Sequence, residues 1–130
     1  MASIFTKIIN GDIPCYKIAE DDDHFAFLDI NPNAKGHTLC VPKKEVDKIL
    51  EMDEASYMKL MAFSRKVGLA LEKAVPCKRV GMTVIGLEVP HVHVHLIPLQ
   101  NMANATFQHK ESLTPEAFEK IAEKIRASLT

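Results

Sequence analysis

The sequence has no tryptophan, two tyrosines and only three cysteines in 130 residues. The cysteines are Cys15, Cys40 and Cys77, an odd number without any Cys-x-x-Cys pair. Such spacing supports neither a disulfide framework nor a four-cysteine zinc site. We therefore expect free thiols that are mostly buried.

An excess of one charge and long apolar runs are also absent. Sixteen basic and seventeen acidic residues give a net charge of -1, so neither nucleic acid nor an anionic membrane is an expected partner. No segment reaches the ~18 consecutive apolar residues of a membrane helix, the first residues lack a signal pattern, and Ala2 excludes N-myristoylation. We expect a cytoplasmic protein.

The length and composition indicate one domain. A chain of 130 residues can bury one substantial core but is too short for two. No internal repeat and no linker divides the sequence. We therefore expect residues 1–130 to form a single domain.

Short β-prone runs are separated by turn-forming residues. Strands are predicted over residues 15–20, 24–30, 37–41, 80–85 and 89–98. Short connections between them favour antiparallel pairing, and the helical patterns lie between and after the strands. The sequence predicts an α+β fold: an antiparallel sheet of about five strands, one long helix across it and a C-terminal helix.

Each predicted helix has a recognisable start. Asp53 is expected to cap the longest helix, which carries an inward apolar stripe and ends at Pro76. Thr114 is expected to cap the C-terminal helix, and Ser3 a short N-terminal one. Both terminal helices are predicted to pack through apolar residues.

The stretch that suggests chemistry is His91-Val92-His93-Val94-His95-Leu96-Ile97-Pro98. Successive side chains of a strand point to opposite faces, so the three histidines share one face and the apolar residues the other. The pattern predicts a row of three imidazoles facing an open cleft, with an apolar back in the core. In contrast, His24 and His109 are expected to be solvated, the latter in a polar loop over residues 100–111.

Three chemistries can use such a row. His93 can be a nucleophile whose neighbours fix its tautomer, while cationic imidazolium partners stabilise a phosphate in the transition state. Alternatively, two of the three can bind zinc with a further ligand such as His37, or the row can simply hold an anion. No acidic residue lies nearby in the sequence as an obvious further ligand, so we expect no metal and no cofactor.

The run from His91 to Ile97 fits His-φ-His-φ-His-φ-φ, where φ is apolar. It resembles the signature of the histidine-triad (HIT) superfamily of nucleotide-binding hydrolases and transferases, nearest to its HINT- and FHIT-like branches. The similarity covers about residues 3 to 99. Further matching segments, in the family's order, are Ile4-Phe5-Thr6-Lys7-Ile8-Ile9, Ile13-Pro14, Ala26-Phe27-Leu28-Asp29-Ile30, Pro32, His37 and Val41-Pro42-Lys43-Lys44.

The resemblance implies a homodimeric α+β enzyme that acts at the α-phosphorus of a purine nucleoside phosphoramidate or dinucleotide. His93 would attack phosphorus to form a covalent nucleotidyl-histidine, which water then cleaves. His91 and His95 would orient it, and His37 would lie near the phosphate. A module that binds purine nucleotides with slow turnover and, less favoured, a zinc-dependent hydrolase are the alternatives.

The resemblance also implies the substrate contacts. Asp29 would accept hydrogen bonds from the ribose hydroxyls. An apolar slot for the base is implied at Ile4, Phe5, Phe27, Ile30 and Leu39. Many members have an Asn and a Gly-Gln-Ser/Thr-Val run before the triad, where this chain reads Val84-Ile85-Gly86-Leu87-Glu88-Val89-Pro90. Glu88 stands near the missing hydroxyl, and we expect its carboxylate to narrow the substrate range towards amine-bearing leaving groups.

Overall fold

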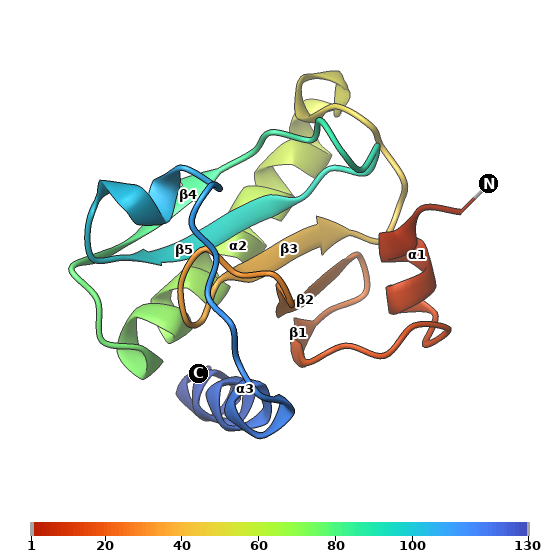
Figure 1. The fold of residues 1–130 in the computed structure, drawn as a ribbon. Helices are drawn as coiled ribbons and strands as arrows, with labels where there is room; N and C mark the ends of the chain where they lie inside the picture. Colours follow the sequence, from red (N-terminus) through yellow and green to blue (C-terminus); the bar gives the residue numbers. More distant parts are fainter. Residues whose placement is uncertain (1, 130) are drawn as a thin grey trace.

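Five antiparallel strands form one sheet in the order β1-β2-β3-β5-β4 in the computed structural model, which describes residues 2–129 (Figure 1). The strands are β1 (Lys17–Glu20), β2 (His24–Leu28), β3 (Thr38–Pro42), β4 (Arg79–Thr83) and β5 (Val94–Leu99). The predicted α+β class with a five-stranded antiparallel sheet is confirmed. The histidine-rich run therefore leads into a strand near the middle of the sheet, between β3 and β4.

The helices have the predicted starts. They are α1 (Ile4–Ile9), α2 (Glu54–Ala74) and α3 (Pro115–Ser128), with short 3-10 turns η1 (Ile49–Glu51) and η2 (Met102–Ala105). The side chains of Ser3, Asp53 and Thr114 each accept a backbone N–H in the first turn of their helix. Within residues 2–129, no helix combines the length and apolar character needed to cross a membrane.

The alternation of side chains gives the sheet two different apolar faces. The face covered by α2 and α3 holds the larger core, which includes Val92, Val94 and Leu96 with at most 1% of each residue exposed. The predicted apolar back of the histidine run is therefore confirmed. The opposite face, next to α1, holds a second cluster: Phe5, Phe25, Phe27, Leu39 and Val41.

Regular pairing of β5 begins at Val94, five residues later than the predicted start of that strand. The last β3–β5 pair is Cys40 with Val94, and before it the chain pairs with the segment after β3 instead. Val92 N–H donates to the carbonyl of Val46 at 2.7 Å. The histidine run is thus anchored by a loop at one end and by the sheet at the other.

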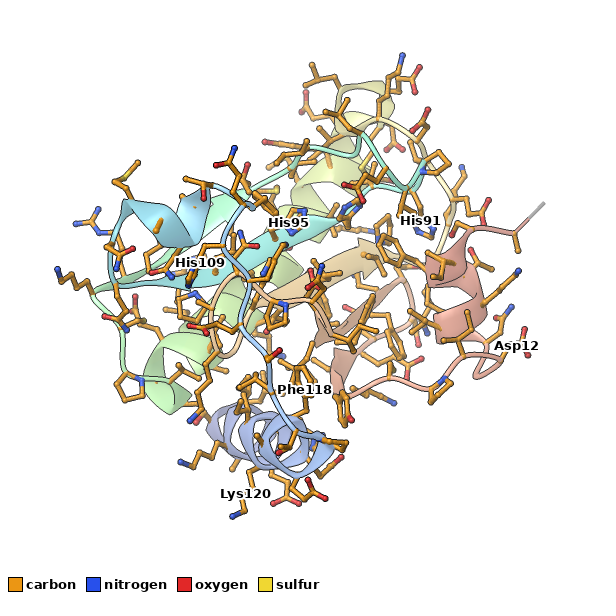
Figure 2. All side chains as sticks on the ribbon, viewed as in Figure 1. Asp12, His91, His95, His109, Phe118 and Lys120 are labelled. Carbon is orange, nitrogen blue, oxygen red and sulfur yellow. The ribbon has the colours of Figure 1, made fainter. Side chains whose placement is uncertain are left out.

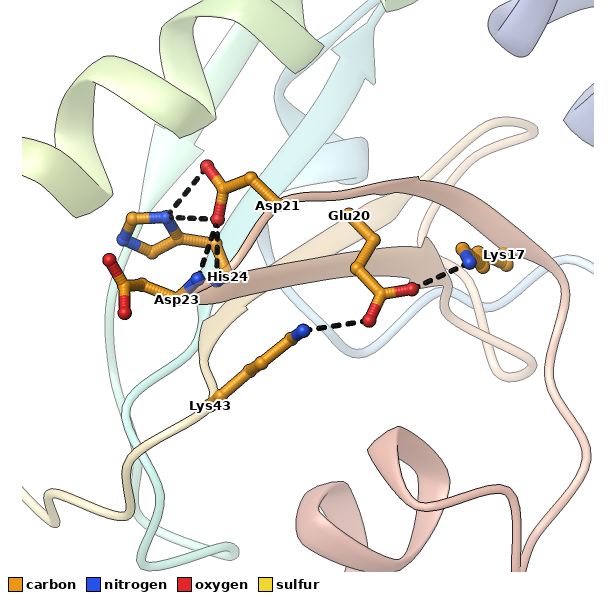
Figure 3. Close-up of polar contacts among 6 residues, drawn as sticks. All are labelled: Lys17, Glu20, Asp21, Asp23, His24 and Lys43. Carbon is orange, nitrogen blue, oxygen red and sulfur yellow. Dashed lines mark hydrogen bonds and ion pairs between the residues drawn. The ribbon is translucent and has the colours of Figure 1, made fainter.

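The prediction that His24 is solvated is wrong, whereas His109 is exposed as predicted. Alternation along β2 points the His24 side chain towards α2, where its ring stacks on Phe63 with centroids 5.0 Å apart. Nδ1 lies 2.9 and 3.1 Å from the two carboxylate oxygens of Asp21, and nearby Glu20 pairs with Lys17 and Lys43 (Figure 3). These contacts stabilise the β1–β2 hairpin.

Candidate active site

His93 is oriented by a backbone carbonyl. Its Nδ1 lies 2.8 Å from the carbonyl oxygen of His91, and because a carbonyl only accepts, Nδ1 must carry the hydrogen. The lone pair of the neutral ring is therefore on Nε2, which makes no hydrogen bond within residues 2–129. Burial lowers the pKa of His93 below its ordinary value, against the opposing effect of that carbonyl. The ring is thus suited to act as a free-base nucleophile through Nε2.

His91 holds that carbonyl in place. Its own ring is completely buried and is fixed at both nitrogens. Nε2–H donates to the carbonyl of Pro42 at 2.7 Å, so Nδ1 accepts from the hydroxyl of Ser3 at 2.6 Å. Figure 2 shows His91 beside α1, the helix that Ser3 caps. The residue therefore positions His93 rather than contacting the reacting atoms through its ring.

His37 and His95 form a second oriented pair. The backbone N–H of Asn33 donates to His37 Nδ1 at 3.0 Å, which leaves the ring hydrogen of neutral His37 on Nε2. That hydrogen points to His95 Nδ1, 2.9 Å away, so neutral His95 carries its hydrogen on Nε2. The rings of His93 and His95 are 4.9 Å apart between centroids. His93 thus presents a lone pair on Nε2, whereas its neighbour His95 presents an N–H donor on Nε2.

The pKa values differ from the expectation of imidazolium partners. Burial, followed by the charges of neighbouring groups, lowers the pKa of His37 to about 3 and that of His95 to about 4. Both rings are consequently neutral at physiological pH. The expected cationic imidazoles are therefore absent from this pair.

The expected open cleft is also largely covered in this structure. His91 is 0% exposed and His93 and His95 are 7% exposed. Phe5 stands edge-on to His93, with centroids 4.9 Å apart, and Phe107 stands edge-on to His95 at the same separation. Aromatic rings therefore limit access to the row from both ends.

Asp29 lies at the edge of this site. Its Oδ2 is 3.7 Å from His37 Nε2, and its Oδ1 accepts the backbone N–H of Asn31 at 2.8 Å. Burial raises the pKa of Asp29, although a fifth of its side chain remains exposed. Because His37 is neutral, the two side chains do not form an ion pair. Asp29 thus keeps acceptor capacity next to the histidines.

The remaining predicted substrate contacts divide into two groups. Phe5, Phe27 and Leu39 are buried together in the cluster on the histidine face of the sheet. In contrast, 49% of Ile4 and 72% of Ile30 is exposed, and neither belongs to this cluster. Glu88 is exposed, yet its charge opposes the lowering of the His93 pKa by burial and adds to the raising of the Asp29 pKa by burial, which places it within electrostatic range of the site.

Asp29, His37 and His95 meet the distance requirement for a metal site, because one ligand atom from each lies within 4.8 Å of the others. Their hydrogen bonds do not fit a zinc ion. His37 Nδ1 accepts from Asn33, so a metal at Nε2 would require a ring with no hydrogen on either nitrogen. The neutral pair uses the His37 hydrogen for its own contact with His95. We therefore derive no reaction step through a metal.

Sequence analysis missed three residues that contact this site from the loop regions. Asn33, which is fully buried, orients His37 and accepts a hydrogen bond from Lys110 Nζ at 2.7 Å. Phe107 covers the rings of His37 and His95. The predicted loop over residues 100–111 does lie at the surface, but 77 positions separate Lys110 from Asn33, and no local pattern reveals such a contact.

The fold and the oriented histidines agree with comparisons to known proteins. The model of the HIT domain family matches residues 10–102 of the chain, which therefore belongs to the HIT family. An HIT-like protein of Borreliella burgdorferi is 34% identical over 135 aligned positions, covering 97% of each chain. The membership that the histidine pattern suggested is confirmed.

Two further relatives show the range of the family. The adenosine 5'-monophosphoramidase of Schizosaccharomyces pombe is 40% identical over 103 residues, covering 78% of this chain and 77% of its own. Among solved structures, a Hit-like protein involved in cell-cycle regulation from Bartonella henselae superposes with a TM-score of 0.85 at 32% identity. That match covers 98% of this chain and 96% of the other.

Proposed function

We propose that this chain is a nucleotide hydrolase or transferase that acts at the α-phosphorus of a purine nucleoside phosphoramidate or dinucleotide. The observation that carries the proposal is the hydrogen bond from His93 Nδ1 to the His91 carbonyl, which leaves an unengaged lone pair on Nε2. The name of the fission yeast relative, an adenosine 5'-monophosphoramidase, supports this substrate class.

The proposed reaction has two displacements. His93 Nε2 attacks the α-phosphorus, forming an N–P bond while the bond from phosphorus to the leaving nitrogen or oxygen breaks. The leaving group takes up a proton from solvent if it departs as an amine. Water then attacks the phosphorus of the nucleotidyl-histidine, the N–P bond breaks, and one proton of the water passes to solvent. The nucleoside monophosphate is released, and His93 is again a neutral imidazole.

The other histidines have distinct parts in this proposal. His95 Nε2–H donates a hydrogen bond to a phosphoryl oxygen, and His37 keeps it in the donor tautomer through the bond to Nδ1. His91 positions the nucleophile through its carbonyl. Asp29 accepts from the ribose hydroxyls, while the slot next to Phe5, Phe27 and Leu39 takes the base, with Ile4 and Ile30 at its exposed side.

The two alternatives differ from this proposal in chemistry. A slow nucleotide-binding module fits the covered histidine row, in which Phe5 and Phe107 restrict access. A zinc-dependent hydrolase is disfavoured by the hydrogen bond that occupies His37 Nδ1. Turnover of an adenosine phosphoramidate, measured with and without a chelator, separates all three. The proposed enzyme turns over in both conditions, the zinc enzyme only without the chelator, and the slow module rapidly in neither.

The variant His93→Asn tests the role of the nucleophile. Asn keeps a side chain of similar reach and polarity but lacks the reactive nitrogen. We expect turnover of an adenosine phosphoramidate to fall by about 10³-fold or more, with AMP affinity retained within a few fold. Equal kcat for the variant and the unmodified protein would show that His93 does not attack phosphorus.

We further propose that the chain forms a homodimer, as the family resemblance implies. β4 is an edge strand of the sheet, and Met82 on it and Ile85 just beyond it are about half exposed. An unpaired edge with apolar side chains favours association with a second copy. Sedimentation equilibrium is expected to give twice the 14.5 kDa chain mass, and a monomer at micromolar concentration would contradict this.

A further inference from the structure

The segment between η2 and α3 crosses the histidine face of the sheet, opposite α2 (Figure 1). We call residues 106–111 the strap. Within residues 2–129, Phe107 is the single non-glycine residue with positive φ, at 62°. Bulky residues rarely adopt this conformation, which persists where surrounding contacts hold it and is frequent at functional sites. The strap is held to the 31–37 loop by the bond from Glu111 N–H to the Pro32 carbonyl.

The strap places the ammonium of Lys110 next to the site. Its Nζ donates to Asn33 Oδ1 at 2.7 Å and lies over the Phe107 ring, 5.0 Å from the centroid. Asn33 in turn donates to His37, and Phe107 stands edge-on to His95. Asn33 therefore links Lys110 to His37, and the Phe107 ring lies between Lys110 and His95. Its remaining N–H groups are not used in hydrogen bonds within residues 2–129.

Lys110 has no carboxylate partner among the described residues. The lysine and arginine ion pairs within residues 2–129 involve Lys17, Lys43 and Arg126 instead. The groups that hold Lys110, an amide oxygen and an aromatic face, are both neutral. A partly buried ammonium with no carboxylate at ion-pair distance is available to bind an anion.

The positive charge of Lys110 affects the pKa values of three neighbouring side chains, Asp29, His37 and His95. Burial is the main cause of the raised pKa of Asp29 and of the lowered pKa values of His37 and His95. The charge of Lys110 opposes the rise at Asp29 and adds to the lowering at both histidines, and no other lysine or arginine contributes to these shifts. The two histidines are neutral at physiological pH, so they donate hydrogen bonds but supply no charge. A phosphoryl group bound to neutral imidazoles alone would keep its negative charge uncompensated.

We propose that Lys110 is the cation that binds and neutralises the substrate phosphate. The inference rests on the proposed function, because it assumes that a nucleotide phosphate lies at the histidine row. It assigns the site to substrates with an anionic phosphoryl group and gives the strap a binding role beyond covering the histidines.

The test compares AMP with adenosine, which lacks the phosphate, by isothermal titration calorimetry. Lys110→Met is expected to weaken AMP binding about tenfold and to leave adenosine binding within about twofold. Lys110→Arg, which keeps the charge, should retain most of the AMP affinity. Lys120→Met is the matched control, because it removes the same charge from the exposed side of α3, away from His95 (Figure 2).

A further variant and a salt series check this interpretation. Lys110→Gln retains a donor for Asn33 and replaces Lys110→Met if that variant does not fold. In the unmodified protein, AMP affinity should fall with ionic strength more steeply than adenosine affinity.

The outcomes separate this inference from the proposed function. In one outcome, the unmodified protein binds AMP more tightly than adenosine, and Lys110→Met either keeps this preference or weakens both affinities by the same factor. Lys110 then does not bind the phosphate, although the proposed function stands. If the unmodified protein binds AMP no better than adenosine, the proposed function and the role of Lys110 are both wrong.

Discussion

The four histidines of the site differ because each ring has a different hydrogen-bond partner. A carbonyl holds the hydrogen of His93 on Nδ1, whereas a backbone N–H excludes the hydrogen of His37 from that atom. The same side chain thus presents a lone pair in one position and a hydrogen-bond donor in another. His24, buried against Phe63 and paired with Asp21, shows that burial alone does not make a histidine part of the site.

Glu88 is where this chain departs most clearly from the family pattern. Its carboxylate lies within electrostatic range of His93 and Asp29, so we expect a cationic amine leaving group to compensate its charge and a phosphate leaving group to be repelled. We expect Glu88→Ser to lower the ratio of kcat/KM for aminoacyl over phosphate leaving groups by about tenfold. Glu88→Gln, which removes only the charge, should give a similar change. An unchanged ratio in both variants would remove this role.

The short helix α1 matters for the site through its first residue. Ser3 caps the helix by accepting from Thr6 N–H and also donates its hydroxyl hydrogen to His91. The helix therefore couples the N-terminal segment to the residue that positions His93. A stability effect and an activity effect should appear together when this hydroxyl is removed.

Ser3→Ala and Thr114→Ala form a matched pair for this coupling. Each removes a helix-capping hydroxyl and is expected to lower the free energy of unfolding by about 1 kcal/mol in urea denaturation. Only Ser3→Ala should also lower kcat, by several fold, because His91 loses one of its two anchors. Equal kcat values for the two variants would contradict a link from α1 to the triad.

The elements of this fold were predictable to different degrees. The helix starts at Ser3, Asp53 and Thr114 depend on local capping, which sequence reveals directly. The late start of β5 was not predictable, because it depends on Val92 pairing with the distant Val46. The alternating run placed the three histidines on one face, but it gave no information on the strap that covers them.

In the whole molecule, the site brings together residues that lie far apart in the sequence. The candidate residues His37 and Asp29 came from resemblance, and the structure brings them next to His95 although 58 positions separate the two histidines. Asn33 and Lys110 belong to two loops that meet only in the folded chain. Contacts of this kind are set by tertiary packing, and a single sequence contains no periodic signal for them.

The buried neutral histidines should also affect the stability of the whole fold. The pKa of His37 is about 3 in the folded chain and about 6.5 in the unfolded one. The unfolded chain thus takes up a proton that the folded chain resists. This contribution is fully present above pH ~6.5 and is lost at about 1.4 kcal/mol per pH unit as the pH falls towards the folded pKa.

His37→Asn removes this titration. Between about pH 6 and pH 4.5, its free energy of unfolding should decrease less steeply than that of the unmodified protein, by about 1 kcal/mol per pH unit. The exposed His109→Asn is the control and should leave the slope unchanged. If His37→Asn does not fold, His95→Asn tests the same effect, since its folded pKa is about 4. Parallel pH profiles for all proteins would show that neither ring resists protonation.

The central claim is that His93 forms a transient bond to phosphorus, and single-turnover mass spectrometry tests it most directly, with the reaction stopped in alkaline denaturant because a phosphorus–imidazole bond is cleaved by acid. Enzyme mixed with a slight excess of an adenosine phosphoramidate should gain the mass of one adenylyl group, on the peptide that contains His93. The His93→Asn protein should gain none. Complete turnover without any adduct on the peptide, or an adduct that persists in His93→Asn, would contradict the account.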